Sequence, residues 1–299
     1  MSTSEMLDLL GDPPDGVRTV VWDGSGEPAA AVADVEFYLP QYTVGPPDPG
    51  ILTAMPRLRV IQLMSAGVGP WLSIVPDNVV LCSGRGVHGG STAELAVAGL
   101  LSLVRELPRM YAGQAAHEWI RTRTDGLAGK RALIVGAGDI GRRVATALDV
   151  FDVSTTFVAR TARDGVHALA ELPALIGRHD VLVLAVPDTP QTHRLVDAAL
   201  LSALPDGAIV VNIARGTILD TDALLVELNA GRLKAFLDVT DPEPLPADHP
   251  LWDAPNVLIT PHIGGGTTGW QGRAAALVRA QLHRYLAGEP LANIVADGY

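Results

Sequence analysis

Three polar patches in the sequence carry the residue types that proton transfer and carboxylate binding require. Each patch follows a run of apolar residues: Arg215 comes after the first run, Glu243 after the second and His262 after the third. A histidine can exchange a proton near neutral pH, a nearby carboxylate favours its protonated form, and an arginine matches a carboxylate in charge and shape. Each residue by itself has a plainer reading, as a surface arginine, a solvated glutamate or a histidine that satisfies a backbone carbonyl. Their order and spacing together favour a single functional site.

A glycine-rich turn precedes these patches. Gly136, Gly138 and Gly141 form the pattern G-x-G-x-x-G, with Asp139 and Ile140 in its variable positions. Such glycines allow a tight turn and let backbone N–H groups approach a pyrophosphate, which the start of the following helix also attracts. The alternative is an ordinary strand-to-helix turn, since the chain contains 31 glycines. The apolar run before the turn and the helical run after it favour a dinucleotide site.

Arg160 occupies a position that bears on the choice of dinucleotide. It lies 19 residues after Gly141, where NAD-binding folds carry an acidic residue for the ribose 2′-hydroxyl. An arginine there, followed closely by Thr161 and Arg163, offers donors for the 2′-phosphate of NADP. The alternative is a solvated arginine, with NAD or both cofactors used. We expect NADP to be the preferred cofactor and keep NAD as the second candidate.

These residues need a scaffold that brings the ends of several strands together. β-Rich runs alternate with helical stretches through the second part of the chain, which predicts an α/β architecture with a parallel sheet. Six such runs match the count of a doubly wound Rossmann fold, and they lie near residues 131–135, 154–158, 181–185, 208–213, 234–238 and 257–260. Residues that follow these strands should meet at the carboxyl edge of the sheet, where ligands bind in this architecture.

The first third of the chain predicts a smaller α/β unit. Its β-rich runs lie at residues 19–22, 35–38, 60–63 and 79–82. A helix is predicted over residues 91–110, with Ser91 and Glu94 as its capping box and Pro108 near its end. A last helix, predicted near residues 272–287, could return to this first unit. The first unit would then be discontinuous in sequence.

Composition excludes several classes of function. The 299 residues carry a net charge of −11 and show no basic run, which disfavours a nucleic-acid partner. Cys82 is the only cysteine, so no intrachain disulfide can form. The N-terminus lacks a signal-peptide pattern, and the longest apolar stretches reach about half the length of a membrane span. A soluble cytoplasmic protein without a metal site is expected.

The order of the motifs resembles that of the D-isomer-specific 2-hydroxyacid dehydrogenases. The resemblance is strongest from Gly126 to Gly265, nearly half of the chain, and weaker over the first third. Its motifs occur in the family's order and at ordinary spacing, in residues 127–145, 186–233, 237–252 and 256–265. The resemblance implies a Rossmann cofactor domain beside a smaller flavodoxin-like α/β substrate domain. It also implies a homodimer that acts on a small 2-oxoacid, most like a glyoxylate or hydroxypyruvate reductase.

The resemblance assigns a role to each candidate residue. Arg215 would bind the carboxylate of the substrate and polarise its 2-oxo group, His262 would be the acid–base residue, and Glu243 would orient His262. Reduction of a ketone by a hydride creates an alkoxide, so a proton donor beside the carbonyl oxygen is also what the chemistry demands. Further residues match cofactor contacts of the family: Thr92, Pro187, Thr192, the carbonyl of Ala214, and Asp238 for the nicotinamide carboxamide.

The match is thinner on the substrate side. The loop at Ala66, Gly67 and Val68 resembles the family's carboxylate loop, whose backbone N–H groups would face the acid group of the substrate. The family commonly has an aspartate shortly after this loop, where this chain continues with Gly69-Pro70-Trp71. This departure leaves the identity of the substrate open and does not affect the reaction class.

We therefore expect residues 93–267 to form the dinucleotide-binding domain and residues 1–92 with 268–299 to form the substrate domain. The predicted function is an oxidoreductase that transfers a hydride between NADP(H) and a small 2-oxoacid, giving a D-2-hydroxyacid. The alternative is a dinucleotide-sensing regulatory protein on the same fold that does not turn over a substrate.

Overall fold

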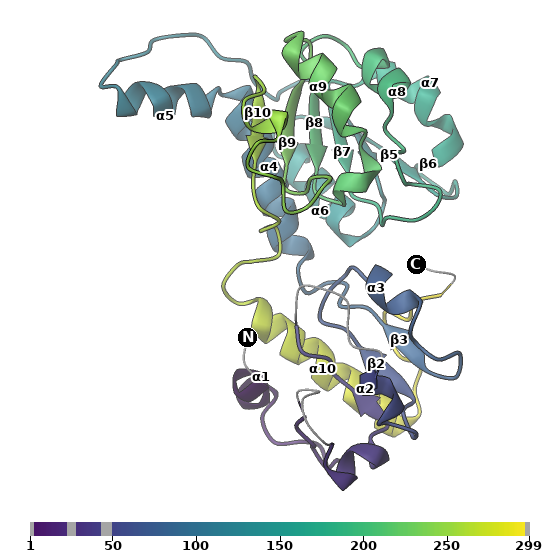
Figure 1. The fold of residues 1–299 in the computed structure, drawn as a ribbon. Helices are drawn as coiled ribbons and strands as arrows, with labels where there is room; N and C mark the ends of the chain where they lie inside the picture. Colours follow the sequence, from purple (N-terminus) through teal and green to yellow (C-terminus); the bar gives the residue numbers. More distant parts are fainter. Residues whose placement is uncertain (1–2, 23–27, 43–49, 297–299) are drawn as a thin grey trace. The chain divides into compact units, whose positions relative to one another are not determined.

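The chain forms two compact α/β units. A computed structural model describes residues 3–22, 28–42 and 50–296 (Figure 1). Unit 1 comprises Met1–His88 with Gly266–Tyr299, and unit 2 comprises Gly89–Gly265. The sequence predicts boundaries a few residues away, at 92/93 and 267/268. The predicted α/β class, with a doubly wound parallel sheet and a second, smaller sheet, is confirmed.

Unit 2 is built on a seven-stranded sheet in which every neighbouring pair is parallel. The order across the sheet is β10-β9-β8-β7-β4-β5-β6. The strands are β4 (Arg131–Val135), β5 (Ser154–Ala159), β6 (Val166–Ala168), β7 (Val181–Leu184), β8 (Ile209–Asn212), β9 (Lys234–Leu237) and β10 (Val257–Ile259). The direction of winding reverses between β4 and β7, and this is the point where such sheets bind ligands. The sequence predicts six of these strands; β6 is a three-residue edge strand that it does not predict.

Apolar residues run continuously along the central strands because helices cover both faces of the sheet. One face packs against α4 (Gly89–Val104) and α6 (Asp139–Asp149). The other face packs against α7 (Leu172–Leu175), α8 (Ala198–Ala203) and α9 (Thr221–Asn229). Successive residues of a strand point to opposite faces, so Leu133 belongs to one core and Ile134 to the other.

The prediction of a single helix over residues 91–110 is wrong. The structure has α4, which starts at Gly89, and then a separate α5 (Leu107–Ala115). Ser91 therefore lies inside the first turn of α4 and is not its N-cap. Glu106 adopts a left-handed conformation that ends the first helix, and Pro108 lies in the first turn of α5, where a missing N–H costs nothing. In Figure 1, α5 projects away from the sheet of unit 2.

Unit 1 holds a three-stranded parallel sheet of β1 (Phe37–Tyr38), β2 (Val60–Gln62) and β3 (Val80–Cys82), in that order. Its helices are α1 (Thr3–Leu10), α2 (Gly50–Thr53), α3 (Gly69–Leu72) and α10 (Trp270–Ala287). Short 3-10 helices occur in both units, at Ala30–Asp34, Leu169–Glu171, Ile176–Arg178, Gly216–Ile218 and Pro250–Trp252.

The predicted strand at residues 19–22 is not formed. These residues pair with no strand among the described residues, although they are rich in β-branched side chains. A strand needs a partner edge as well as propensity, and the neighbouring β1 is only two residues long. Val21 is accordingly 55% exposed.

A buried amide pair joins α10 to the sheet of unit 1. Gln281 and Gln62 are both fully buried, and the Gln281 side-chain amide donates to Gln62 Oε1 at 2.7 Å. Gln62 in turn donates to the carbonyls of Leu63 and Ser83, at 2.8 and 3.1 Å, where β2 and β3 have just ended. Since buried amides must find partners, the pair fixes the ends of both strands against one helix.

Within residues 3–22, 28–42 and 50–296, no helix is long and apolar enough to cross a membrane. The same residues contain no group of three His, Cys, Asp or Glu side chains placed to hold a metal ion.

Candidate active site

The sheet of unit 2 brings the three polar patches to one edge. β8, β9 and β10 are adjacent and parallel, so their carboxyl ends lie side by side. Arg215 follows β8, Asp238 and Glu243 follow β9, and His262 follows β10. Residues far apart in the sequence therefore share one sheet edge, as the alternation of strands and helices predicts.

His262 and Glu243 form a close pair. His262 Nδ1 lies 2.5 Å from Glu243 Oε1, and both side chains are partly exposed, at 45% and 39%. A carboxylate can only accept a hydrogen bond, so Nδ1 carries the proton of this contact. Nε2 hydrogen-bonds to no described residue and is the ring nitrogen that can exchange a proton with a bound molecule.

Asp238 holds the loop that carries His262. Its buried carboxylate accepts hydrogen bonds from Thr260 Oγ1 at 2.6 Å, from Ile263 N at 2.9 Å and from Gly264 N at 2.9 Å. The backbone N–H of His262 donates to the Asp238 carbonyl at 2.8 Å. His262 adopts a left-handed backbone conformation with φ of 53°, which such a network of bonds can maintain. In this structure Asp238 therefore positions the histidine loop.

Gly216 allows the loops of Arg215 and Glu243 to approach each other. A Cβ atom at Gly216 would overlap the backbone of Thr240 and Asp241, which lead into Glu243. Only a residue without a side chain fits between the two loops.

The conformation of the Arg215 loop depends on Asn212, which is fully buried at the end of β8. The side-chain amide of Asn212 donates to the Arg215 carbonyl at 2.9 Å, and its oxygen accepts from Ala214 N at 3.1 Å. The Ala214 carbonyl, predicted to line the cofactor, accepts a bond from Arg215 Nη1 at 2.6 Å. Asn212 is not among the residues predicted from the sequence for this site, although a lone amide that ends an apolar strand is a recognisable signal.

The three glycines of the glycine-rich turn meet different demands. Gly136 has φ of 118°, and a Cβ there would overlap the Ala185 backbone. A Cβ at Gly141 would overlap the Gly136 carbonyl, so this glycine lets α6 pack closely on the turn. Gly138 faces open space and precedes α6 without a capping side chain, which leaves the first N–H groups of that helix available. This turn fits the pyrophosphate of a dinucleotide.

The side chains of the two variable residues of the turn, Asp139 and Ile140, contact other parts of the protein. Asp139 Oδ1 lies 2.8 Å from Arg143 Nε, and Asp139 Oδ2 is buried with no hydrogen-bond partner among the described residues. Ile140 packs against the core beneath α4 and α6. The backbone N–H groups of Asp139 and Ile140 are the parts of these residues that lie at the start of α6.

Cationic side chains surround the turn. Arg163 Nη2 donates to the Ala137 carbonyl at 3.3 Å, and Arg142 Nε donates to the same carbonyl at 3.2 Å. Arg160 and Thr161 are exposed at the end of β5, beside β4, and neither hydrogen-bonds to a described residue. Arg142 is a cation that was not predicted from the sequence, although its place just after the glycine-rich turn, in the first turn of α6, is a signal for it.

Other predicted cofactor residues shape neighbouring loops. Thr192 Oγ1 donates to the Pro187 carbonyl at 2.6 Å and accepts from Thr189 N at 2.8 Å, which closes the loop after β7. Thr92 lies in the first turn of α4, where a Cβ added to Gly264 would meet both its side chain and Asp238 Oδ2. Thr92 therefore lies beside the Asp238 network.

The predicted substrate loop lies in unit 1. Val68 is completely buried in the core and anchors the loop, while Ala66 and Gly67 are half-buried. Ser65 Oγ donates to the Gly67 carbonyl at 2.8 Å, and Gly84 N donates to the Ser65 carbonyl at 2.7 Å. The amides of Ala66 and Gly67 donate to no described residue, as an anion-binding loop requires.

Comparison with known proteins identifies the family of the chain. Residues 97–264 match the family described as "D-isomer specific 2-hydroxyacid dehydrogenase, NAD binding domain". D-3-phosphoglycerate dehydrogenase of Mycobacterium bovis is 34% identical over 270 residues, which cover 84% of this chain and 49% of that protein. The chain thus spans about half the length of this curated relative.

Two solved structures show the same fold. A D-isomer specific 2-hydroxyacid dehydrogenase from Xanthobacter autotrophicus, in complex with NADPH and MES, is 30% identical with a TM-score of 0.81, over 93% of this chain and 89% of that one. An NADPH-dependent glyoxylate/hydroxypyruvate reductase from Sinorhizobium meliloti, in complex with NADP and sulfate, is 28% identical with a TM-score of 0.77, over 89% and 86% of the two chains. The family resemblance of the motifs is confirmed: the chain belongs to the D-isomer specific 2-hydroxyacid dehydrogenases.

Proposed function

We propose that the protein is an NADP(H)-preferring reductase of small 2-oxoacids, of the glyoxylate or hydroxypyruvate type, that forms D-2-hydroxyacids. NAD(P)-dependent hydride transfer on 2-hydroxyacids follows from the family. The observation that carries the proposal is the 2.5 Å contact of His262 with Glu243, at the sheet edge that also carries Arg215.

The proposed chemistry divides between the cofactor and the chain. A bound nicotinamide dinucleotide supplies the hydride. The chain must supply a proton to the oxygen of the reduced ketone, and His262 Nε2 is the group that would deliver it. Glu243 keeps the proton of the ring on Nδ1 and stabilises the charged imidazolium from which the Nε2 proton leaves.

The substrate's acid group needs a positive partner. Arg215 offers a guanidinium whose fork of donors matches a carboxylate, and its carbonyl is fixed by Asn212. Within unit 1, which we assign as the substrate domain, the backbone amides of Ala66 and Gly67 are proposed as uncharged donors to an anion, in a loop that Val68 anchors. The unit that carries the glycine-rich turn would bind the dinucleotide.

The proposed preference for NADP(H) rests on charge at the end of β5. Arg160 and Thr161 present unoccupied donors there, and Arg163 reaches the glycine-rich turn itself. A 2′-phosphate would meet cations, whereas an NAD-selective site offers a carboxylate at this position. Both solved relatives described above were found with NADPH or NADP, which supports the same choice.

We further propose a homodimer, formed through α5 and the segment after it. Trp119 is 95% exposed and Tyr111 is 64% exposed, an unusual display of aromatic surface for a monomer. Trp119 also borders a hollow lined by Leu101, Leu107, Met110 and Ile120. Sedimentation should show that the protein is a dimer and that the Trp119→Glu variant is a monomer. Val150→Glu is the control, because Val150 is an exposed apolar residue elsewhere in unit 2, and this variant should remain a dimer.

Turnover tests the proposed function. The rate of NADPH oxidation is measured with glyoxylate, hydroxypyruvate, pyruvate and bulkier 2-oxoacids. The same rates are measured with NADH for comparison. Rapid oxidation with the small acids is expected. If NADPH binds and no acid is reduced, the enzyme assignment fails and the dinucleotide-sensing alternative takes its place.

A further inference from the structure

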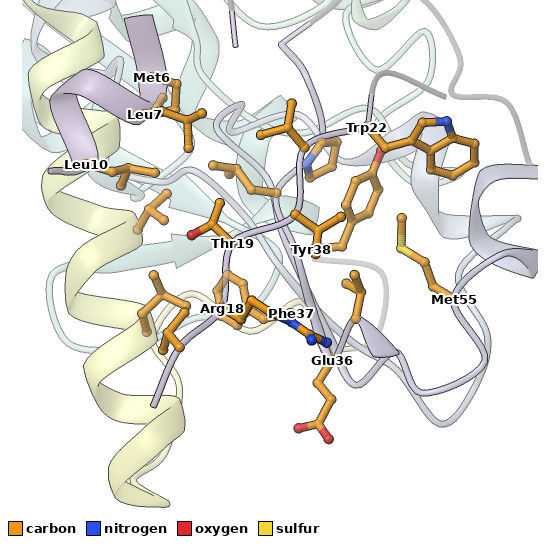
Figure 2. A pocket seen from close by; sticks show the side chains of 18 of the residues that line it. Met6, Leu7, Leu10, Arg18, Thr19, Trp22, Glu36, Phe37, Tyr38 and Met55 are labelled. Carbon is orange, nitrogen blue, oxygen red and sulfur yellow. The ribbon is translucent and has the colours of Figure 1, made fainter. Parts of the chain in front are cut away.

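Unit 1 contains a cavity that the proposed reaction does not use. Its volume is about 480 Å³, and it lies between α1, the segment at residues 16–22, β1 and α10 (Figure 2). This volume falls within the range of about 300–1,000 Å³ that is typical of small-molecule sites. All of its lining residues belong to unit 1.

The lining is mainly hydrocarbon and aromatic. Leu10, Val20, Phe37, Met55 and Leu282 line it from five different segments of unit 1. Water gains few hydrogen bonds in such a space, and apolar cavities in proteins bind apolar molecules for this reason. The lining therefore favours an occupant with a largely apolar surface.

The charged groups at the cavity neutralise one another. Its charged lining residues are Arg18, Asp34 and Glu36. Arg18 Nη2 lies 3.2 Å from Asp34, and Arg57 bridges Asp34 and Glu36 at 3.5 and 3.1 Å. Each charged lining residue is thus already paired with a group of opposite charge, and Arg59 also acts on Glu36. An ionised ligand would have to compete with these ion pairs for its own partner.

Tyr285 and Tyr38 contribute hydroxyl groups to the lining, beside the polar side chains of Thr19 and Gln41. The Tyr285 hydroxyl is already used, because it donates to Glu36 Oε2 at 2.8 Å; burial and this bond raise the pKa of Tyr285 to about 12. Tyr38 also lines the cavity, and burial raises the pKa of its hydroxyl, which stays protonated at neutral pH. The Tyr38 hydroxyl bonds to no described residue, so it offers one hydrogen bond to an occupant.

We propose that this cavity is a binding site for an uncharged, largely apolar small molecule with one hydrogen-bonding group, which contacts the Tyr38 hydroxyl. The site lies within unit 1 and is independent of the proposed reductase activity. Its occupant differs from a 2-oxoacid because it carries no carboxylate, and its binding does not require a dinucleotide.

The full-length protein is titrated with N-phenylnaphthylamine, an uncharged fluorescent probe with a single N–H group. Saturable binding of one probe per chain is expected. Val20→Trp should fill part of the cavity and weaken binding about tenfold, because the probe loses buried apolar surface. Tyr38→Phe keeps the ring, removes the hydroxyl, and should weaken binding about threefold.

Two controls make the test decisive. Leu72→Trp adds the same side chain at an exposed position of unit 1 outside the cavity and should bind the probe like the unmodified protein. Anilinonaphthalene sulfonate, a charged analogue, should bind more weakly than the uncharged probe. Lack of saturable binding, or equal binding by Val20→Trp with an unchanged melting temperature, overturns the site. Equal or tighter binding of the sulfonate overturns the assigned ligand class.

Discussion

Replacement of Asp238 by asparagine should loosen the loop that carries His262. The carboxylate of Asp238 accepts three bonds, from Thr260 Oγ1, Ile263 N and Gly264 N, and the residue is 3% exposed. An asparagine has one oxygen. If this oxygen serves Thr260 and Ile263, the new amide group faces the buried N–H of Gly264, and two donors oppose each other.

The size of the effect follows from that geometry. One charge-assisted bond is lost and one buried N–H is left without an acceptor, which costs about 2–3 kcal/mol of the free energy of unfolding. Unit 2, Gly89–Gly265, is of a size at which each kcal/mol shifts the melting temperature by about 2–4 °C, so the loss is about 4–12 °C.

Thermal unfolding and reductase turnover measure the two consequences of Asp238→Asn. We expect a lower melting temperature together with a lower kcat, since the ring of His262 loses its fixed position. Asp164→Asn, at an exposed site of the same unit, is the matched control and should change neither. A loss below about 0.5 kcal/mol, within the range of ordinary surface substitutions, would refute the role of this carboxylate in holding the loop.

Three other predictions follow from the same geometry. His262→Ala should lower kcat by about 10²–10⁴-fold and leave the Kd for NADPH nearly unchanged; similar turnover would refute its role as proton donor. Arg160→Asp should lower the ratio of kcat/KM for NADPH over NADH by at least about tenfold, whereas Arg178→Asp, at the opposite edge of the sheet, should not. The N–H of Ala223 contributes most to holding the pKa of Asp220 below its ordinary 3.8, so this carboxylate stabilises the fold above that pH and ceases to do so as pH falls through its lower folded value. Acid titration of unfolding should thus be shallower in Asp220→Asn, and identical titrations would contradict the assignment.

Hydrophobic periodicity, together with the glycine and proline residues that end helices and strands, predicted most of the fold. This succeeded because the elements of unit 2 follow their local sequence pattern. Its central strands are apolar runs between helices, and an all-parallel sheet buried on both faces requires that pattern. The wrong predictions concern elements whose formation depends on another part of the chain. Residues 19–22 have strand propensity but pair with no described strand, since β1 offers an edge of only two residues, whereas β6 forms along the longer edge of β5. The break between α4 and α5 rests on the left-handed backbone of Glu106, which no pattern of apolar residues reveals.

The candidate site shows the same division. The order of the motifs predicted Arg215, Glu243 and His262 as site residues, and the family that the motifs indicate is confirmed. The lone amide of Asn212 was visible at the end of its strand, but the sequence contained no sign that Gly216 would let the Arg215 loop approach the Glu243 loop. The role of Gly216 depends on the backbone of Thr240 and Asp241, which follows a different strand.

The sequence alone determined the type of fold, the family and the chemical groups at the sheet edge, because hydrophobic period and residue type are local properties of the chain. The tertiary structure decided which groups meet: the 2.5 Å contact of His262 with Glu243, the bonds of Asp238 to the histidine loop, and the convergence of Arg142 and Arg163 on Ala137. Distances between such segments depend on the packing of strands and helices across the whole sheet, and no local pattern encodes them.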